Sequence, residues 1–466
     1  TYHRDVTKNM SPQMSLALAL SGSFRGVFIN TLWIRANNLK EQGKYYDAME
    51  LAELISDLQP RFPEVWSFLG WNMAYNISVA TKTPAERWMW VNRGVELLRD
   101  KGIPANPTSV ELHKQLAWTF LHKIGQFSDD MHWYYKQQLA LEWQKMLGRP
   151  PQASTESILA WFEPIAEMDN RFFATDVIDR RITIRLDELA GQYPQHGDGL
   201  RALSRLDPIS FEDRLEELRG QVDPRATELL EALDELARIN ADTLNRSGQD
   251  PVAAFLRAYP EARPAVEMFE RMDERLDYAL LNRLGHVQLK VEAEAVGMNV
   301  RWQAERAEDN EQLAVWLHKR DEATVRVRDR ILLPFVRAKV LREHFHMSGS
   351  MMLTLMEGRW LIHASGQEPT PMPLDWRHPA THGLYWSARG VQVASTIRNK
   401  SQDDYFRVLN TDRQVLHAIQ ALTHNGRIVY DPFQDYYQQL PDPRYIEAYS
   451  MALFGAKDRV GGKYIE

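Results

Sequence analysis

The sequence contains no cysteine, and glycine and proline account for only 24 and 23 of its 466 residues. Without cysteine the chain has no disulfide bond, thiolate zinc site, iron–sulfur cluster, covalent haem attachment or cysteine nucleophile. The modest glycine and proline content excludes collagen-like and low-complexity chains. What is left, with 44% hydrophobic and 26% charged residues, is a folded chain long enough for about two to four domains.

An excess of positive charge and long apolar runs are lacking as well. The chain has 56 basic and 63 acidic residues, and its net charge of −7 predicts no nucleic-acid partner. The apolar stretch Met14–Leu20 ends at Ser21, well short of the roughly 20 residues that cross a membrane. Residue 1 is Thr, so 1–25 is interpreted as an N-terminal segment that could follow a removed leader or membrane anchor.

Motifs of the common enzyme classes are missing too. The sequence has no G-x-S-x-G nucleophile elbow, no P-loop, no H-E-x-x-H zinc motif and no G-x-G-x-x-G turn. The carboxylate pairs Asp129 with Asp130 and Glu305 with Glu308 lie in charge-rich stretches expected to be helical, without a neighbour that would raise a pKa. We therefore predict that the protein is not an enzyme and has neither catalytic residues nor a cofactor.

A repeated pattern is the most specific feature that the sequence does have. Its residues are Trp66, Leu69, Gly70 and Met73, preceded by Ala48, Ala52 and Pro60. Their spacing resembles the tetratricopeptide pattern W-x2-L-G-x2-Y, then A-x3-F, then P. Leu32 lies 34 residues before Trp66, which is the period of the repeat, but the next unit opens at His113, 47 residues after Trp66. The slip of 13 residues predicts an inserted loop near 76–84.

Small side chains give this pattern its physical meaning. Ala36, Ala48, Gly70 and Ala117 allow antiparallel helices to approach closely, while larger side chains fill the remaining space. We expect residues 26–146 to form a tetratricopeptide-repeat (TPR)-like stack of helical hairpins, with Gly70 at a close helix contact.

Helix geometry predicts which residues line the inner surface of this stack. Residues four and seven positions apart return to nearly the same direction at 100° per residue. The stripe next to the packed one then consists of Trp33, Asn37 and Lys40, of Ser67, Trp71 and Ala74, and of Lys114, Trp118 and Leu121. Aromatic side chains of this kind are typical of a partner-binding surface. The alternative is that another part of the same chain covers them.

The middle of the chain, 152–346, is predicted to be a helical domain that begins after the helix-breaking run Gly148–Pro151. Ser210 is expected to cap a helix after Pro208. The apolar spacing from Asn310 to Phe345 predicts one long helix that is kinked at Pro334. Mixed charges along 212–235 are interpreted as a solvated helix face.

The C-terminal region, 347–466, changes in composition. Glycines and serines near 347–380 predict a loop-rich or short-strand insertion. Apolar residues at helical spacing then predict a helical hairpin, whose second helix spans 411–422 after a long connection. The hairpin is a candidate for a diverged relative of the N-terminal repeats.

Four histidines, two just before this region and two inside it, form the only metal-like cluster. His344 and His346 diverge by about 200° on a helix, and Pro379 restricts His378 to extended geometry, which separates it from His382. The sequence therefore predicts no metal site. A metal-assisted hydrolase built on these four histidines is kept as the competing hypothesis.

A family resemblance joins the repeat to two tryptophan-rich segments, Glu86–Arg93 and Leu374–Pro379. With them the chain resembles an uncharacterised bacterial family of membrane-anchored TPR-containing proteins. The resemblance implies a location at the bacterial cell envelope and transfers no catalytic residue. The leading hypothesis is an all-α, non-enzymatic scaffold or accessory subunit that binds other protein subunits through the stripe. A structural subunit of a lattice or filament is a further alternative.

Overall fold

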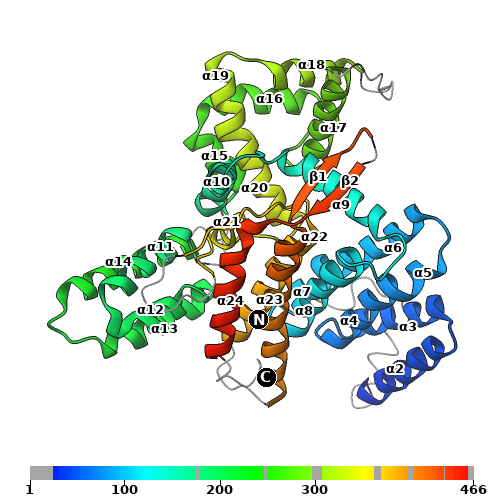
Figure 1. Ribbon diagram of the computed structural model, residues 1–466, viewed down its shortest axis with the longest axis horizontal. Coiled ribbons are helices and arrows are strands. Elements are labelled where there is room, and N and C mark those ends of the chain that lie inside the picture. Colours follow the sequence, from blue (N-terminus) through cyan, green and yellow to red (C-terminus); the bar gives the residue numbers. More distant parts are fainter. Residues whose placement is uncertain are drawn as a thin grey trace. The chain divides into compact units, whose positions relative to one another are not determined.

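The computed structural model describes residues 25–173, 178–245, 249–295, 297, 307–360, 369–396, 402–434 and 436–459. The chain is 77% helix and 3% strand, which confirms the predicted all-α class with a small short-strand insertion. It divides into two compact units, Thr1–Tyr135 and Lys136–Glu466. Figure 1 shows the helices of both units. The division lies within a helix at Tyr135, before the Gly148–Pro151 run at which the sequence predicted a boundary.

The first unit consists of helices that pair as antiparallel hairpins. In chain order they are α2 (Arg25–Glu41), α3 (Tyr45–Leu58), α4 (Pro63–Trp71), η2 (Asn72–Ile77), α5 (Ser78–Ala80), α6 (Pro84–Glu96), η3 (Leu97–Gly102), α7 (Ile103–Ala105), α8 (Val110–Trp118), η4 (Thr119–Ile124) and the start of α9 (His132–Leu147). The segments η2, η3 and η4 are π-helical and continue the α-helices that precede them.

Local sequence explains where these helices begin. Pro84 occupies the first turn of α6, where its missing N–H costs nothing. Thr83 and Glu86 form a capping box, in which the Thr83 hydroxyl accepts from the Glu86 N–H and the Glu86 carboxylate accepts from the Thr83 N–H. The chain turns between α2 and α3 at Gly43, whose φ of +75° suits a residue without a β-carbon.

The close helix contact expected at Gly70 is present. A β-carbon at Gly70 would lie 2.7 Å from the side chain of Leu98, and one at Gly94 would lie 2.8 Å from the carbonyl oxygen of Gly70. Because both distances are too short for non-bonded carbon, these two positions require glycine if α4 is to pack on α6 and η3 as it does.

The predicted inserted loop near 76–84 is wrong. Ser78–Ala80 is still helical, and only Thr81–Thr83 separates this helix from the next. The extra residues instead lengthen the two helices of the second hairpin, which run over 63–80 and 84–105 and each contain a π-helical turn, at Asn72–Ile77 and Leu97–Gly102. A π-turn takes in additional residues without ending a helix, so an insertion need not appear as a loop.

The second unit is also helical. Its elements are the remainder of α9, α10 (Thr155–Phe172), α11 (Arg180–Gln192), η5 (Pro194–His196), α12 (Gly197–Leu203), α13 (Pro208–Gln221), α14 (Thr227–Asn245), α15 (Pro251–Ala258), η6 (Pro260–Ala262), α16 (Arg263–Arg271), α17 (Tyr278–Ala295), α18 (Ala307–His318), α19 (Glu322–Val325), η8 (Arg326–Leu332), α20 (Leu333–Glu343), α21 (Gly349–Met356), α22 (Pro379–Thr396), α23 (Gln402–Asn425), β1 (Arg427–Asp431), β2 (Tyr436–Leu440), η9 (Pro443–Tyr445) and α24 (Ile446–Arg459).

A buried carboxylate ties three of these helices together. Asp169 of α10 is fully buried, and its oxygens accept from the guanidinium of Arg342 in α20 at 2.5 and 2.8 Å. The Ser348 hydroxyl and the Ser350 N–H, at the start of α21, each donate to Asp169 at 2.9 Å. Four hydrogen bonds, two of them from a guanidinium, therefore compensate for the burial of this charge.

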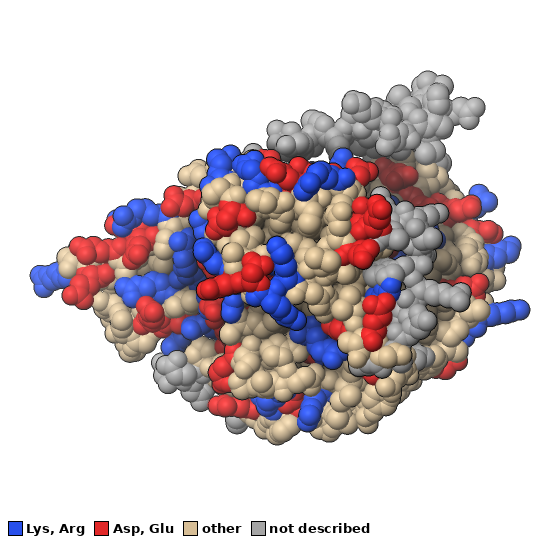
Figure 2. All heavy atoms as spheres, turned by 90° about the horizontal axis from the view of Figure 1, so that it is seen from above, with Lys and Arg blue, Asp and Glu red and all other residues tan. Residues whose placement is uncertain are grey.

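Helices α11 to α14 form a lobe with an apolar core of its own. Its fully buried residues include Ile182, Leu186, Leu200, Phe211 and Leu236. In Figure 2, Lys and Arg alternate with Asp and Glu over the surface of this lobe, at the left of the picture. The pairs are exposed, such as Arg219 with Asp234 at 3.0 Å, which agrees with the solvated helix face expected along 212–235.

The expected cap of α13 needs a correction. Asp207, not Ser210, caps this helix, because its carboxylate accepts from the N–H groups of Ile209 and Ser210 at 2.9 and 3.0 Å. Pro208 takes the first helical position, which moves the cap one residue upstream of the proline.

The long helix predicted from Asn310 to Phe345 is also wrong. It is interrupted at Lys319 and Arg320, and Asp321 caps a new helix by accepting from the Thr324 N–H. Pro334 follows directly on the π-turn η8. A polar triplet with a capping aspartate ends the first helix although the apolar spacing continues across it.

The C-terminal region contains the helical hairpin that the sequence predicts. Helices α22 and α23 pack along each other, but only residues 397–401 separate them, so the long connection was wrong. The described residues between α21 and α22, 357–360 and 369–378, form turns and loops. The strands lie further along: β1 and β2 pair antiparallel, with Arg427 opposite Leu440 and Asp431 opposite Tyr436.

Candidate functional site

Two of the predicted stripe residues come together in the first unit. The ring of Trp71 stacks on Tyr75 with centroids 5.6 Å apart and planes inclined by 16°. Trp118 stacks on His122 in the same way, at 4.6 Å and 12°. The Tyr75 and His122 rings are 5.9 Å apart, and the Tyr75 hydroxyl lies 3.4 Å from His122 Nδ1. These four side chains form a continuous row, which we call the aromatic ladder.

The ladder is partly open and uncharged at neutral pH. Trp118 is 39% exposed, while Trp71, Tyr75 and His122 are half-buried. Burial raises the pKa of Tyr75, and burial together with the Lys123 ammonium lowers the pKa of His122. Lys123 Nζ lies 5.3 Å from the Tyr75 ring, so a cation touches one face of the row.

A buried carboxylate, that of Asp129, binds the Lys123 ammonium that lies beside the ladder. Asp129 Oδ2 accepts from Lys123 Nζ at 2.5 Å and from the Tyr135 hydroxyl at 3.2 Å, and Oδ1 accepts from the Met131 N–H at 2.9 Å. Arg87 lies 3.3 Å from the same carboxylate. Burial opposes ionisation of Asp129, but these donors prevail and lower its pKa to about 2.

Asp129 is therefore not the solvated helical residue that the sequence suggested. It lies in the turn between η4 and α9 and is almost fully buried. Its role depends on partners 6 and 42 residues away in the chain, Lys123 and Arg87, so spacing alone could not reveal it.

The other stripe residues do not all join the ladder. Trp33 packs instead on Phe62 and Phe68, with ring centroids 6.1 and 5.2 Å apart, at the edge of an apolar cluster around Leu69. This is the covered state that was the alternative for the stripe. Lys114 forms an ion pair with Glu111 at 2.6 Å.

The remaining stripe positions are distributed as follows: Asn37 and Ser67 are half-buried, Ala74 and Leu121 are buried, and Lys40 lies in α2 with its side chain outside the described residues. Tyr75 and His122 were missed. Both follow a stripe tryptophan by four residues, and this W-x3-aromatic spacing on successive helices was a signal that the sequence contained.

The histidines proposed as metal ligands point to different partners. His344 stacks on Tyr278 with centroids 3.9 Å apart, and His382 Nε2 lies 2.8 Å from the carbonyl oxygen of Trp376. His378 Nδ1 accepts from the Ala380 N–H at 3.0 Å.

Burial, reinforced by the charge of Lys136, lowers the pKa of His378 to about 4 despite the opposing Asp375. His346 has a φ of +51°. Across the described ranges, no group of three or more His, Asp or Glu side chains could hold a metal ion. The geometry therefore does not favour the metal-assisted hydrolase.

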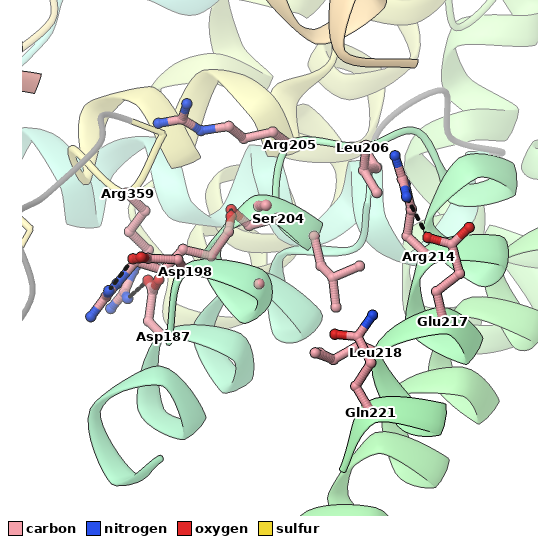
Figure 3. A pocket seen from close by; sticks show the side chains of 14 residues that line it. Asp187, Asp198, Ser204, Arg205, Leu206, Arg214, Glu217, Leu218, Gln221 and Arg359 are labelled. Atoms are coloured by element: carbon pink, nitrogen blue, oxygen red, sulfur yellow. Dashed lines mark hydrogen bonds and ion pairs between the residues drawn. The ribbon is translucent and has the colours of Figure 1, made fainter. Parts of the chain in front are cut away.

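A second candidate site lies in the α11–α14 lobe. It is a pocket of about 570 Å³, lined by Asp187, Asp198, Gly199, Arg201, Ala202, Leu203, Ser204, Arg205, Leu206, Arg214, Glu217, Leu218, Gln221 and Arg359. Figure 3 shows Asp187, Asp198 and Arg359 gathered on one side of this pocket, with Leu206 and Leu218 on the other.

The charged side of the pocket is built around Asp187. Its carboxylate accepts from Arg359 at 2.6 Å, and burial raises the pKa of Asp187 although Arg359 and Arg201 oppose the shift. Arg201 lies 3.7 Å from the Asp198 carboxylate. Arg205 donates to the Trp360 carbonyl at 2.9 Å and lies over the Trp360 ring.

The described helices include none that is both long and apolar enough to span a membrane. Comparison of the chain with protein-family models, curated proteins and solved structures gives no significant match.

Proposed function

We propose that this chain is a non-enzymatic scaffold or accessory subunit with a TPR-like N-terminal unit, which binds a partner protein on the aromatic ladder within a larger, membrane-associated assembly. The observation that carries this proposal is the ladder itself. Two stacked aromatic pairs on successive hairpins present ring faces that need no hydrogen-bond partner, and such faces suit apolar or proline side chains of an extended segment.

The rest of the first unit supports a role in protein contacts. Further large apolar side chains are exposed on it: Ile34, Tyr46, Val79, Met89, Phe127 and Trp133. Phe127 is 77% exposed and lies in the turn that Asp129 anchors. Aromatic residues are enriched at interfaces because they bury a large area at a small cost in side-chain entropy.

The test begins with affinity purification of the full chain from its native organism, with membranes solubilised, followed by mass spectrometry. The variant with Trp71→Ala and Trp118→Ala is expected to lose the partner, with affinity reduced by at least about thirtyfold if both residues are hot spots. Phe406→Ala is the matched control, because Phe406 is 49% exposed but lies in the second unit and outside the ladder.

Unchanged partner recovery by the folded double variant would show that the ladder is not the binding surface. Circular dichroism verifies the fold of each variant. Light scattering distinguishes a different partner chain from a second copy of this one, which is the outcome expected of a lattice or filament subunit.

A further inference from the structure

The pocket in the α11–α14 lobe has the dimensions of a small-molecule site. Its volume of about 570 Å³ falls within the range of roughly 300 to 1,000 Å³ that ligand pockets occupy. Its walls come from one lobe of the second unit together with Arg359, which follows α21. The aromatic ladder contributes nothing to it, so an occupant would be separate from the protein partner proposed above.

The lining combines apolar and charged side chains. Leu203, Leu206 and Leu218 belong to the core of the lobe and also line the pocket. Figure 3 places Leu206 and Leu218 across the pocket from Arg359 and the two aspartates, with Arg214, Glu217 and Gln221 on the same side as the leucines. A ligand that fills this space therefore meets leucine side chains as well as charged groups, which suits an amphipathic molecule.

Arg201 indicates which charge the polar part of the ligand should carry. Arg359 is already matched by Asp187 at 2.6 Å. Among the described residues, the carboxylate within ion-pair distance of Arg201 is that of the exposed Asp198, at 3.7 Å, and Asp187 attracts Arg201 from further away. Within the described part of the chain, the Arg201 guanidinium donates no hydrogen bond, although only 21% of its side chain is exposed. A guanidinium in this state gains most from an anionic oxygen.

The carboxylates limit how much charge the ligand can carry. Asp187 and Asp198 lie on the same side of the pocket as Arg201 and would repel a polyphosphate or a dicarboxylate. A single negative charge on the ligand is repelled less by these two carboxylates than two or more charges are.

We propose that this pocket binds an amphipathic monoanion of the fatty-carboxylate class, with its head group on Arg201 and its hydrocarbon part along Leu203, Leu206 and Leu218. The scaffold then has a small-molecule site that is distinct from its partner surface.

The test uses two probes on the full-length protein. The fluorescent monoanion 1-anilinonaphthalene-8-sulfonate is titrated first, and laurate is then added as competitor. We expect saturable fluorescence that laurate displaces, and displacement by the uncharged dodecanol at least about tenfold weaker, since it lacks the charge that Arg201 recognises.

Variants locate the binding. Arg201→Gln is expected to weaken laurate competition at least about tenfold, and Ala202→Trp is expected to abolish it by filling the pocket. Arg219→Gln is the matched control: Arg219 lies on α13 in the same lobe, outside the pocket lining, and should leave the affinity unchanged.

The proposal is overturned if laurate does not displace the probe. It is equally overturned if Arg201→Gln, verified as folded by circular dichroism, binds laurate as tightly as the unmodified chain. Equal affinity for laurate and dodecanol would show an apolar site in place of an anion site.

Discussion

The two candidate sites are both built from helices, but one is a row of aromatic side chains on a surface and the other is a pocket. In the first unit, aromatic side chains four residues apart on successive helices stack outward into a row, which gives a surface. In the α11–α14 lobe, leucines hold the helices together and leave a pocket with arginines at its rim. A row of rings suits a chain laid across it, whereas a pocket suits a ligand that it can enclose.

Exposed apolar side chains are also distributed unequally between the two units. Among the described residues, seven large hydrophobic side chains are exposed in the first unit and six in the second, although the second unit is more than twice as long. This distribution supports the proposal that the first unit is the part that meets other proteins. Four changes test this contrast.

The largest effect is expected from Asp129→Ala. The substitution leaves Lys123 buried without its carboxylate partner, and removal of one member of a buried pair costs about 3–5 kcal/mol. The first unit should lose stability by this amount in urea denaturation, together with the ladder. Laurate binding in the lobe should persist, and loss of both sites together would show that the two units unfold as one.

Acid should destabilise the second unit through His378. Its pKa is about 4 in the folded chain and 6.5 when exposed, so below pH 6.5 the unfolded chain takes up a proton that the folded chain refuses. Stability is therefore lost as pH falls from 6.5 to 4, by up to about 3 kcal/mol.

Urea denaturation at pH 7 and pH 4.5 measures this loss, and His378→Gln should reduce the difference between the two. The Asp129 network is expected to survive over the same range. Asp129 has a pKa of about 2 in the folded chain, so its contribution to stability is lost only as the pH falls from 3.8 toward 2. His122, whose pKa is also lowered, should add a smaller loss because it is half-buried. A His378→Gln variant with unchanged pH dependence would contradict the assignment.

Helix caps should have a moderate and similar effect in both units. Thr83→Ala removes the capping box of α6 and Asp207→Ala removes the cap of α13, each at a cost of about 1 kcal/mol. Thermal unfolding measures both. A Ser210→Ala substitution that costs as much as Asp207→Ala would restore the cap that the sequence predicted.

The smallest effect is expected at the rim of the pocket. Arg214→Gln breaks an exposed ion pair with Glu217, and such pairs contribute about 0.3–0.5 kcal/mol on a helix. Laurate affinity should change less than twofold, since Arg214 lies across the pocket from Asp187 and Arg359. A large loss of laurate affinity would show that the head group lies near Arg214 and not on Arg201.

The sequence predicted much of the helical architecture, because helices and their close contacts follow from the spacing of residues a few positions apart. The close contact at Gly70 and the hairpin of α22 and α23 follow from small and apolar residues at helical intervals. The errors in the predicted helices occur where one local sequence pattern is compatible with two different structures. The extra residues expected near 76–84 lengthened the helices in place of forming a loop, and apolar spacing continued across the break at Lys319.

The ladder was predicted in part, since Trp71 and Trp118 were named and Tyr75 and His122 were not. Trp33 shares their helical position but is covered by Phe62 and Phe68. The sequence could not reveal this, because the position of a residue on one helix does not show what packs against it. The lobe pocket was not predicted at all. Arg201 and Arg359 are far apart in the chain and meet only after α21 reaches the lobe.

By itself the sequence determined the all-α class, the absence of thiol chemistry and the small residues at which helices approach, because composition and spacing act within a few turns of one helix. Only the tertiary structure decided which aromatic side chains stack into the ladder, which carboxylate is buried behind them and which arginine faces the pocket. These choices depend on burial and on charges brought together across long stretches of chain, and such interactions exist only once the helices have packed.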